Sequence, residues 1–187
     1  MAVPMKRGMN VALTREIPTL TGVVLGVRLV ANEPVLVDNL VVATLLCNAS
    51  GKVLSDEHFV FFNQLTSPDM SVEQLRRAVG GDFEQVEVDL PKVPDDVQRI
   101  VVVAYVNEGT PQRRQLGQLR EATVRVLDLR DESELVRSED LAPALTTETG
   151  LVLAELYRHG GDWKFKVIGQ GYADGIRAIA DDYGVRL

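Results

Sequence analysis

Residues 150–171, GLVLAELYRHGGDWKFKVIGQG, decide the fold of this chain. Trp163, Phe165 and Val167 alternate with single lysines, and such period-two alternation is typical of a strand with one buried face. The Gly160-Gly161 pair ahead of them can adopt the left-handed conformations of a tight hairpin turn. The stretch therefore predicts a β-hairpin with one arm at 151–158 and a return arm around Trp163.

The same alternation continues towards the N-terminus. In 86–90 and in 122–126, apolar residues occupy every second position and polar residues stand between them. The run 99–106, RIVVVAYV, is apolar on both faces and rich in β-branched residues, which predicts a central strand. The prolines of LPKVPDD just before it predict a tight turn or a short helical turn. Further strands are predicted at 23–30, 35–47 and 58–62.

Two segments carry helix signals. SVEQ at 71–74 is spaced as a capping box, and Leu75 and Val79 continue an apolar stripe, so a short helix is predicted from Ser71 to Val79. Near the C-terminus, apolar residues follow Ile176 at i+3, i+4 and i+7, and a glycine after them can cap the helix. A C-terminal helix is predicted there.

Length and composition fit one globular domain. The chain has 187 residues, of which 45% are hydrophobic and 25% charged. That is long enough for one sizeable core and short for two. Many short strands and few helices predict a mainly β protein, a sandwich of two mostly antiparallel sheets with short helices, including the C-terminal one. One such domain is expected over residues 1–187.

Charge and hydropathy limit the partners. The sequence holds 27 acidic and 20 basic residues, a net charge of −7, and such a surface repels phosphate backbones, so nucleic acid is not expected. No apolar run reaches the length of a membrane span, and the N-terminus lacks the apolar region of a signal peptide, so direct membrane insertion is not expected. A cytoplasmic location is the default. Cys47, the single cysteine, lies in an apolar run and is predicted to be a buried hydrophobe.

Familiar catalytic motifs are missing from the sequence. GQGYADG at 169–175 resembles a dinucleotide-binding fingerprint, but its glycine spacing is wrong and a second parallel strand has no room to follow, so a turn is the preferred interpretation. His58 and His159 have no partners at zinc-ligand spacing. No nucleophile elbow or phosphate-binding loop is present. An enzyme, such as a metal-assisted hydrolase, is therefore the third choice of function.

One acidic loop raises a specific question. GGDFEQVEVDLPKVP at 80–94 places Asp82 and Glu84 after a glycine pair and ahead of an alternating strand. It can be a metal-binding loop, the remnant of one, or the polar lead-in to a strand. None of the acidic clusters has the twelve-residue spacing of an EF-hand, so any calcium site must be assembled from several loops.

Four stretches resemble the TerD family of tellurite-resistance and stress-response proteins. They are KRGMNVALTREIPTL at 6–20, SDEHFVFFNQLTSPD at 55–69, GGDFEQVEVDLPKVPDDVQRI at 80–100 and TETGLVLAELYRHGGDWKFKVIGQGYADG at 147–175. The last stretch, with its E-L-Y-R-H-x-G-x-W-K-F-K core, is the most specific. The resemblance implies a β-sandwich of two mostly antiparallel sheets, in agreement with the alternation.

The resemblance also implies calcium binding in loops at one end of the sandwich. Its acidic signatures are L-G-W-D, D-L-D-A-S and G-D-D-E, and this chain departs from each of them. They become LGVR at 25–28, NLVVA at 39–43 and GDFE at 81–84. Acids expected from the family pattern are thereby replaced by Arg28, Asn39, Val41 and Phe83.

The remaining oxygen ligands form a weak, vestigial set. Calcium takes about six to eight oxygens, several of them from carboxylates. This chain keeps Asp82, Glu84, Asn39 and Glu108, the last in place of a family aspartate. Arg28 adds a positive charge, and the surviving acids are predicted to pair with it instead. Calcium binding is expected to be weak or lost, and no other cofactor is expected.

Two functions remain in view. The first is a non-enzymatic TerD-like stress-response protein of the tellurite-resistance type, which acts through other proteins of a stress-response system. The alternative is a calcium-binding TerD-like protein that responds to Ca²⁺ through a rearranged set of ligands. The sequence leaves the partners and the oligomeric state open.

Overall fold

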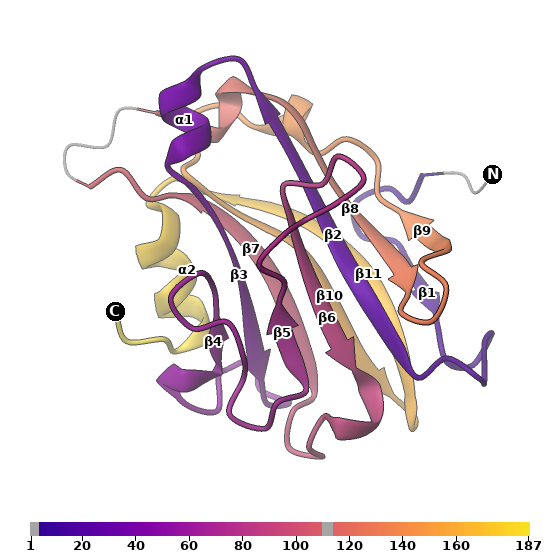
Figure 1. Ribbon diagram of the computed structural model, residues 1–187. Helices are drawn as coiled ribbons and strands as arrows, with labels where there is room; N and C mark the ends of the chain where they lie inside the picture. The colour runs from indigo at the N-terminus through magenta and orange to yellow at the C-terminus, as the bar shows by residue number, and fades with distance from the viewer. Residues whose placement is uncertain (1–3, 110–113) are drawn as a thin grey trace.

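Alternating apolar residues build two facing layers of β-structure in the computed structural model, which describes residues 4–109 and 114–187 (Figure 1). All pairs of named strands are antiparallel. The predicted fold class, a mainly β sandwich of two antiparallel sheets with short helices, is therefore confirmed.

The two sheets differ in size and order. The first runs β1-β11-β10-β7-β3-β4 and the second β5-β6-β2-β8-β9. In that order, the strands of the first sheet are Asn10–Ala12, Asp162–Tyr172, Gly150–His159, Arg99–Val106, Leu40–Cys47 and Phe59–Val60. Those of the second are Val72–Gln74, Glu84–Asp89, Gly22–Ala31, Leu119–Asp128 and Glu134–Arg137.

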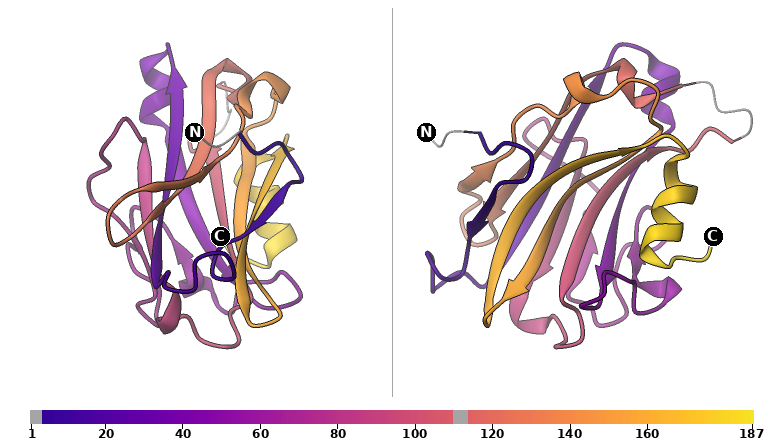
Figure 2. Two further views of the ribbon diagram at one scale, coloured as in Figure 1. Left: turned by 90° about the vertical axis from the view of Figure 1, so that its right-hand side faces the viewer. Right: turned by 180° about the vertical axis from the view of Figure 1, so that it is seen from behind.

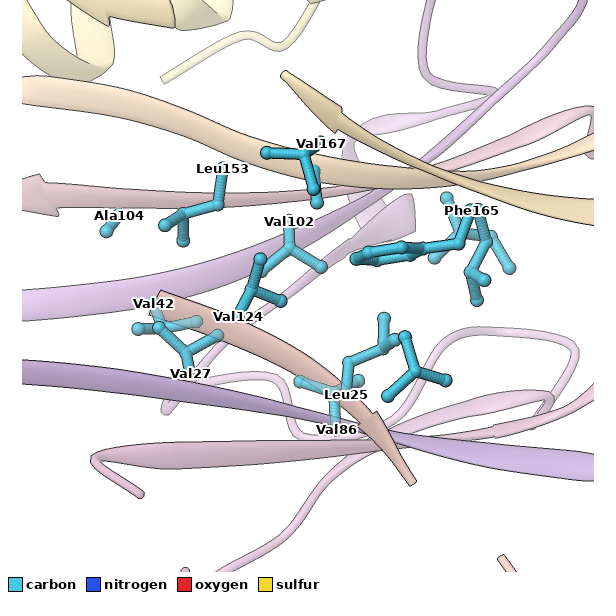
Figure 3. Close-up of a cluster of buried hydrophobic side chains, with 14 of the residues drawn as sticks. Leu25, Val27, Val42, Val86, Val102, Ala104, Val124, Leu153, Phe165 and Val167 are labelled. Atoms are coloured by element: carbon cyan, nitrogen blue, oxygen red, sulfur yellow. The ribbon is translucent and has the colours of Figure 1, made fainter. Parts of the chain in front are cut away.

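The main core fills the space between the sheets. Every second residue of the central strands points into it, as the period of a strand requires. Leu25 and Val124 of the second sheet face Val102 and Phe165 of the first, and all four are fully buried (Figure 3). Burial of apolar surface on this scale is the dominant stabilising contribution to the fold.

The hairpin β10–β11 forms as its sequence predicts. Gly160 and Gly161 have φ values of 59° and 85°, and Arg158 pairs with Trp163 just behind this turn. The indole is buried, and the Arg158 guanidinium carbon lies 4.4 Å from the centre of its ring. The arginine therefore covers an aromatic residue that anchors one end of the core.

The C-terminal helix α2, Gly175–Tyr183, adds a third layer and is confirmed. It packs on the outer face of the first sheet, as the view from behind shows (Figure 2). Ile179 and Ala180 on its buried side contact a second apolar cluster that includes Val103 and Cys47. Gly184 ends the helix in the left-handed conformation, with φ of 73°. The prediction of a buried cysteine is also confirmed.

The predicted strand 35–47 is wrong at its beginning. Pro34–Asp38 form the short helix α1, and the strand begins at Leu40. Proline at the first helical position favours this start, because its fixed φ suits a helix and its missing N–H would have no intrahelical partner there. Short 3-10 turns are Asp56–His58, Leu90–Lys92, Leu116–Gln118 and Ala142–Ala144. The second of these confirms the turn predicted from the prolines. No helix within 4–109 and 114–187 is long and apolar enough to cross a membrane.

The predicted helix from Ser71 to Val79 is wrong. Val72–Gln74 form β5, an edge strand paired with β6, and Val72 is fully buried opposite Val88. The Ser71 backbone amide donates to the Asp69 carboxylate at 2.8 Å, so the serine belongs to a turn and does not cap a helix. Pairing with an existing sheet outweighs a local capping signal, which is worth only about 1 kcal/mol.

Candidate functional site

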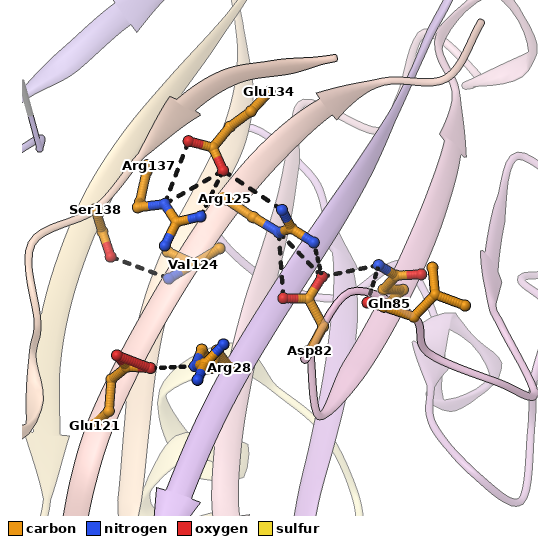
Figure 4. Close-up of polar contacts among 10 residues, drawn as sticks. Arg28, Asp82, Gln85, Glu121, Val124, Arg125, Glu134, Arg137 and Ser138 are labelled. Carbon is orange, nitrogen blue, oxygen red and sulfur yellow. Dashed lines mark hydrogen bonds and ion pairs between the residues drawn. The ribbon is translucent and has the colours of Figure 1, made fainter. Parts of the chain in front are cut away.

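The acidic loop folds over the outer face of the second sheet. Residues 75–83 connect β5 to β6, and Gly80 and Gly81 turn the chain back with φ values of 67° and 83°. The Phe83 amide then donates to the Val27 carbonyl at 2.7 Å, which fixes the loop to β2. As a result, Asp82 lies on top of the sheet (Figure 4).

Asp82 is held by Arg125 of β8. The Arg125 Nη2 lies 2.9 Å from Asp82 Oδ2, and Nε lies 3.2 Å from Oδ1. The Gln85 side-chain amide donates a further hydrogen bond of 2.8 Å to Oδ2. Side-chain exposure is 3% for Asp82 and 19% for Arg125. This is a buried, two-pronged ion pair, the geometry in which a guanidinium binds a carboxylate most strongly.

Gly26 makes this contact possible. It lies opposite Arg125 in the β2–β8 register, directly beneath the carboxylate. A Cβ atom at position 26 would lie 2.3 Å from Asp82 Oδ2, closer than any real contact. Glycine is thus required here for close approach and not for an unusual backbone angle.

The ion pair belongs to a longer network on the same face. Arg125 also contacts Glu134 of β9, which pairs with Arg137 at 2.7 Å. Hydrogen bonds and charge from Arg137, and to a smaller extent from Arg125, lower the pKa of Glu134. Beside them, Arg28 pairs with Glu121 (Figure 4). The network alternates in sign, so no charge of the group stands alone.

The predicted pairing of the surviving acids with Arg28 is wrong. Arg28 lies opposite Thr123 in the β2–β8 register, whereas Asp82 lies over Gly26 and therefore meets Arg125. No motif marked Arg125. Its place as an outward residue in the alternation of 122–126 could be inferred from the sequence, but its partner depends on the register between strands.

Glu84 does not point to the same place as Asp82. It pairs with Val27 in register and lies on the side of β6 that carries the core residues Val86 and Val88. Its carboxylate accepts a long hydrogen bond of 3.5 Å from the Gln74 side-chain amide. Burial raises the pKa of the Glu84 carboxyl.

Asn39 and Glu108 lie just beyond the ends of two strands of the first sheet, β3 and β7. The Asn39 carbonyl accepts from the Asn107 amide at 2.7 Å, which places both residues at the α1 end of β3 and β7. The Asn39 side-chain amide donates to the Val35 carbonyl at 2.8 Å. Glu108 pairs with Arg114 at 2.5 Å.

The four candidate ligands therefore do not form one calcium site. Asp82 lies in the loop ahead of β6 and Glu84 is the first residue of that strand, whereas Asn39 and Glu108 lie just outside β3 and β7 of the first sheet. In the part of the chain that the structure describes, no group of three or more His, Cys, Asp or Glu side chains could hold a metal ion. Val41, where the family pattern has an acid, is buried on the outer face of the first sheet. The residues do not fit the oxygen-rich shell that calcium requires, and weak or absent binding stays a prediction.

Fold and site together define a class of protein. It is an antiparallel two-sheet β-sandwich whose acidic loop is closed by an arginine–carboxylate network. A family model described as TerD domain matches residues 1–183, so the chain belongs to the TerD family.

Similar proteins are named for resistance and stress. The chain is 35% identical over 190 residues to "Tellurium resistance protein TerD" of Serratia marcescens, covering 99% of this chain and 98% of that one. It is 35% identical over 196 residues to "General stress protein 16U" of Bacillus subtilis (strain 168), covering 100% of both. The crystal structure of a homologue of telluride resistance protein (TerD) from Streptomyces coelicolor A3(2) matches with a TM-score of 0.66 at 17% identity, covering 86% of this chain and 95% of that one, and supports the fold.

Proposed function

We propose that this protein is a non-enzymatic, cytoplasmic stress-response module that acts through protein partners and does not need calcium at its acidic loop. Its relatives carry the names of tellurium resistance and general stress proteins. The sandwich supplies rigid outer faces, and loops supported by a rigid scaffold are where binding commonly resides.

One observation carries the proposal. Asp82, in the loop that resembles the family's calcium loop, has its charge neutralised by Arg125, at 2.9 Å, and its oxygens occupied by two donors. A guanidinium within the protein thus supplies the positive charge and hydrogen bonds that a bound cation would otherwise provide. The contacts that hold the loop on the sheet are thus made by the chain itself.

A catalytic role has less support. The Ser55 hydroxyl lies 2.7 Å from His58 Nδ1, but Ser55 also accepts from the Glu57 amide and caps a turn. The contact is exposed and connects residues three positions apart. A catalytic serine needs in addition a group that orients the histidine and donors for the developing oxyanion. Within the described residues, no hydrogen bond orients the second ring nitrogen of His58.

Genetic complementation combined with partner capture tests the proposal. A strain lacking the gene is exposed to tellurite and to general stress, and survival is measured after complementation with the unmodified protein, with Ser55→Ala or with His58→Gln. All three should restore survival. Crosslinked partners are then identified. Interface variants that weaken partner binding should also reduce survival, and the rank order of the variants should be the same for both quantities. Survival that requires Ser55 or His58, or that persists after all captured partners are lost, would overturn the proposal.

A further inference from the structure

A cavity adjoins the ion-paired loop on the outer face of the second sheet. It has a volume of about 230 Å³ and opens between loop 75–83 and the β8–β9 connection. Buried Val24 and Leu127 form its floor, and Leu75, Val79 and Leu129 form its walls. The cavity is therefore lined by aliphatic side chains on neighbouring strands and loops.

Size and exposure indicate what the cavity can hold. Ligand pockets for drug-sized molecules measure roughly 300–1,000 Å³, so this one suits a single side chain better than a cofactor. Val79 at its rim is 56% exposed, although it is a large aliphatic residue. A small aliphatic pocket that opens to solvent is the kind of site that an anchoring side chain fills in a protein interface.

The rim is acidic, and its charges lack partners. Glu73 and Glu87 lie directly opposite each other on β5 and β6, an arrangement that destabilises an antiparallel pair. Glu87 faces the cavity, and its pKa is raised by burial and then by Glu73. Glu132 lines the other side and holds a left-handed backbone, with φ of 61°.

These three acids have no salt-bridge partner in the described part of the chain. Glu73, Glu87 and Glu132 form no ion pair within residues 4–109 and 114–187, and Arg125 at the rim is already bound to Asp82 and Glu134. The cavity thus combines an apolar floor with acidic side chains that have no salt-bridge partner. It complements a ligand that is aliphatic at its centre and cationic at its ends.

We propose that this cavity is the docking site for a partner-protein segment in which an aliphatic side chain is flanked by lysine or arginine. The proposal rests on the proposed function, since it specifies where a protein partner binds. The aliphatic side chain enters between Val24 and Leu127. The flanking cations neutralise Glu87 with Glu73 on one side and Glu132 on the other. Anionic ligands are repelled by this rim.

Peptide titration followed by NMR tests the site. The ¹⁵N-labelled full chain is titrated with the acetylated, amidated pentapeptide KALAK, in which residues two apart in an extended strand point to the same side. Amide resonances of Val79, Gly80, Glu87 and Glu132 should shift in a saturable manner. The matched peptides KASAK, without the aliphatic anchor, and EALAE, with reversed charge, should bind at least tenfold more weakly.

Matched variants assign the binding to this rim. Glu87→Lys should weaken KALAK binding at least tenfold, whereas Asp96→Lys, the same charge change at an exposed position outside the cavity, should weaken it less than twofold. Equal binding to both variants, shifts centred elsewhere, or no saturable shift would overturn the proposal. Concentration-dependent self-association that is lost in Glu87→Lys would also overturn it, in favour of a second copy as the occupant.

Failure of this site is distinguishable from failure of the proposed function. If KALAK does not bind, but the partners captured in cells still bind Glu87→Lys and support survival, the docking site is wrong and the partner-based function stands. If KALAK binds but survival is unaffected by loss of every captured partner, the function is wrong and the site is real.

Discussion

At the scale of single residues, Gly26 matters because it has no side chain. Because position 26 has no Cβ, Asp82 can lie on the sheet and meet Arg125 across it. A carboxylate that is 3% exposed loses its hydration, and the guanidinium and the Gln85 amide replace it. Breaking such a pair leaves an uncompensated group in a poorly hydrated place, which costs more than the pair itself contributes.

Asp82→Asn should lower the free energy of unfolding by about 2 kcal/mol, since hydrogen bonds to charged groups contribute roughly 1.5–3 kcal/mol. For a chain of this size the melting temperature should fall by about 4–8 °C. Thermal unfolding followed by circular dichroism measures it. Glu121→Gln, in the more exposed pair with Arg28, is the matched control and should cost less than about 1 kcal/mol. If the two variants have the same melting temperature, the Asp82–Arg125 pair contributes no more to stability than the exposed Arg28–Glu121 pair.

Glu155 presents the opposite case, a buried acid that is not bound by a bidentate arginine. It lies between Val101 and Lys166 on the outer face of the first sheet and is 8% exposed. Burial raises its pKa, and Arg99 and Lys166 oppose the rise only in part. Ionisation of Glu155 is therefore disfavoured in the folded state.

The sign of the pH dependence follows from that direction. Below the ordinary glutamate value of 4.5, both folded and unfolded chains hold the proton and no penalty exists. As the pH rises from that value to the higher folded pKa, the penalty develops, and above the folded pKa it stays constant. Glu155→Gln should thus increase stability at pH 7, by about 1.4 kcal/mol for each tenfold change in the ionisation constant, and leave it unchanged at pH 3.5. Urea unfolding at both pH values measures this, and a gain that is equal at both would refute the assignment.

At the scale of elements, packing partners outweigh local signals. The segment 71–79 has helical spacing, yet Val72 and Gln74 are buried as alternate residues of an edge strand. In contrast, α2 agrees with its sequence because its apolar stripe meets an apolar sheet face. That face includes Cys47, and burial raises the pKa of its thiol to about 12.

Removal of the helix from the sheet should therefore expose the thiol. Ile179→Asp places a charge in the fully buried contact between α2 and the sheet and should lower stability by about 3 kcal/mol, in the range of large core truncations. The rate at which Cys47 reacts with a disulfide reagent at pH 8 should rise at least tenfold. Asp181→Ala, on the exposed side of the same helix, should change neither quantity. If Cys47 reacts at an unchanged rate in Ile179→Asp, the packing of α2 is not what protects the thiol.

At the scale of the whole molecule, the sandwich separates residues that the family pattern would bring together. Asp82 and Glu84 lie at the start of β6 in the second sheet, and Asn39 and Glu108 lie just outside β3 and β7 of the first. Even Asp82 and Glu84, two residues apart, do not meet: Asp82 belongs to the loop that folds over the outer face of the second sheet, whereas Glu84 is the first residue of β6 and lies on its core side. The side chains of Asp82, Glu84 and Asn39 each have a partner within the protein already.

Calcium should therefore leave global stability unchanged. Binding with Kd of 10 µM would add about 2.7 kcal/mol at 1 mM calcium, which is roughly 5–10 °C in melting temperature. The expected shift between chelator and 1 mM calcium is below about 1 °C. Arg125→Gln, which frees the Asp82 carboxylate, is the sharper variant and should remain unresponsive, because Glu84 faces the other side. A rise of several degrees in the unmodified protein would favour the calcium-responsive alternative.

The sequence by itself determined the sandwich, the β10–β11 hairpin, the C-terminal helix and the buried cysteine. These follow from periodicity, glycine pairs and caps, which act over a few residues and need no knowledge of distant partners. The segments 35–38 and 71–79 fold differently from their sequence prediction, because their local signals suit more than one structure.

Only the tertiary structure decided the partner of Asp82. The register of β2 against β8 sets Arg125 opposite Gly26 and Arg28 opposite Thr123, and a slip of one residue would reverse both faces. Such a register depends on how two strands almost a hundred residues apart pack their buried sides. The acidic cavity has the same origin, because Glu73 and Glu87 become neighbours only when β5 joins β6. Spacing along the chain carries local geometry, whereas a site built across strands exists only once the sheet has formed.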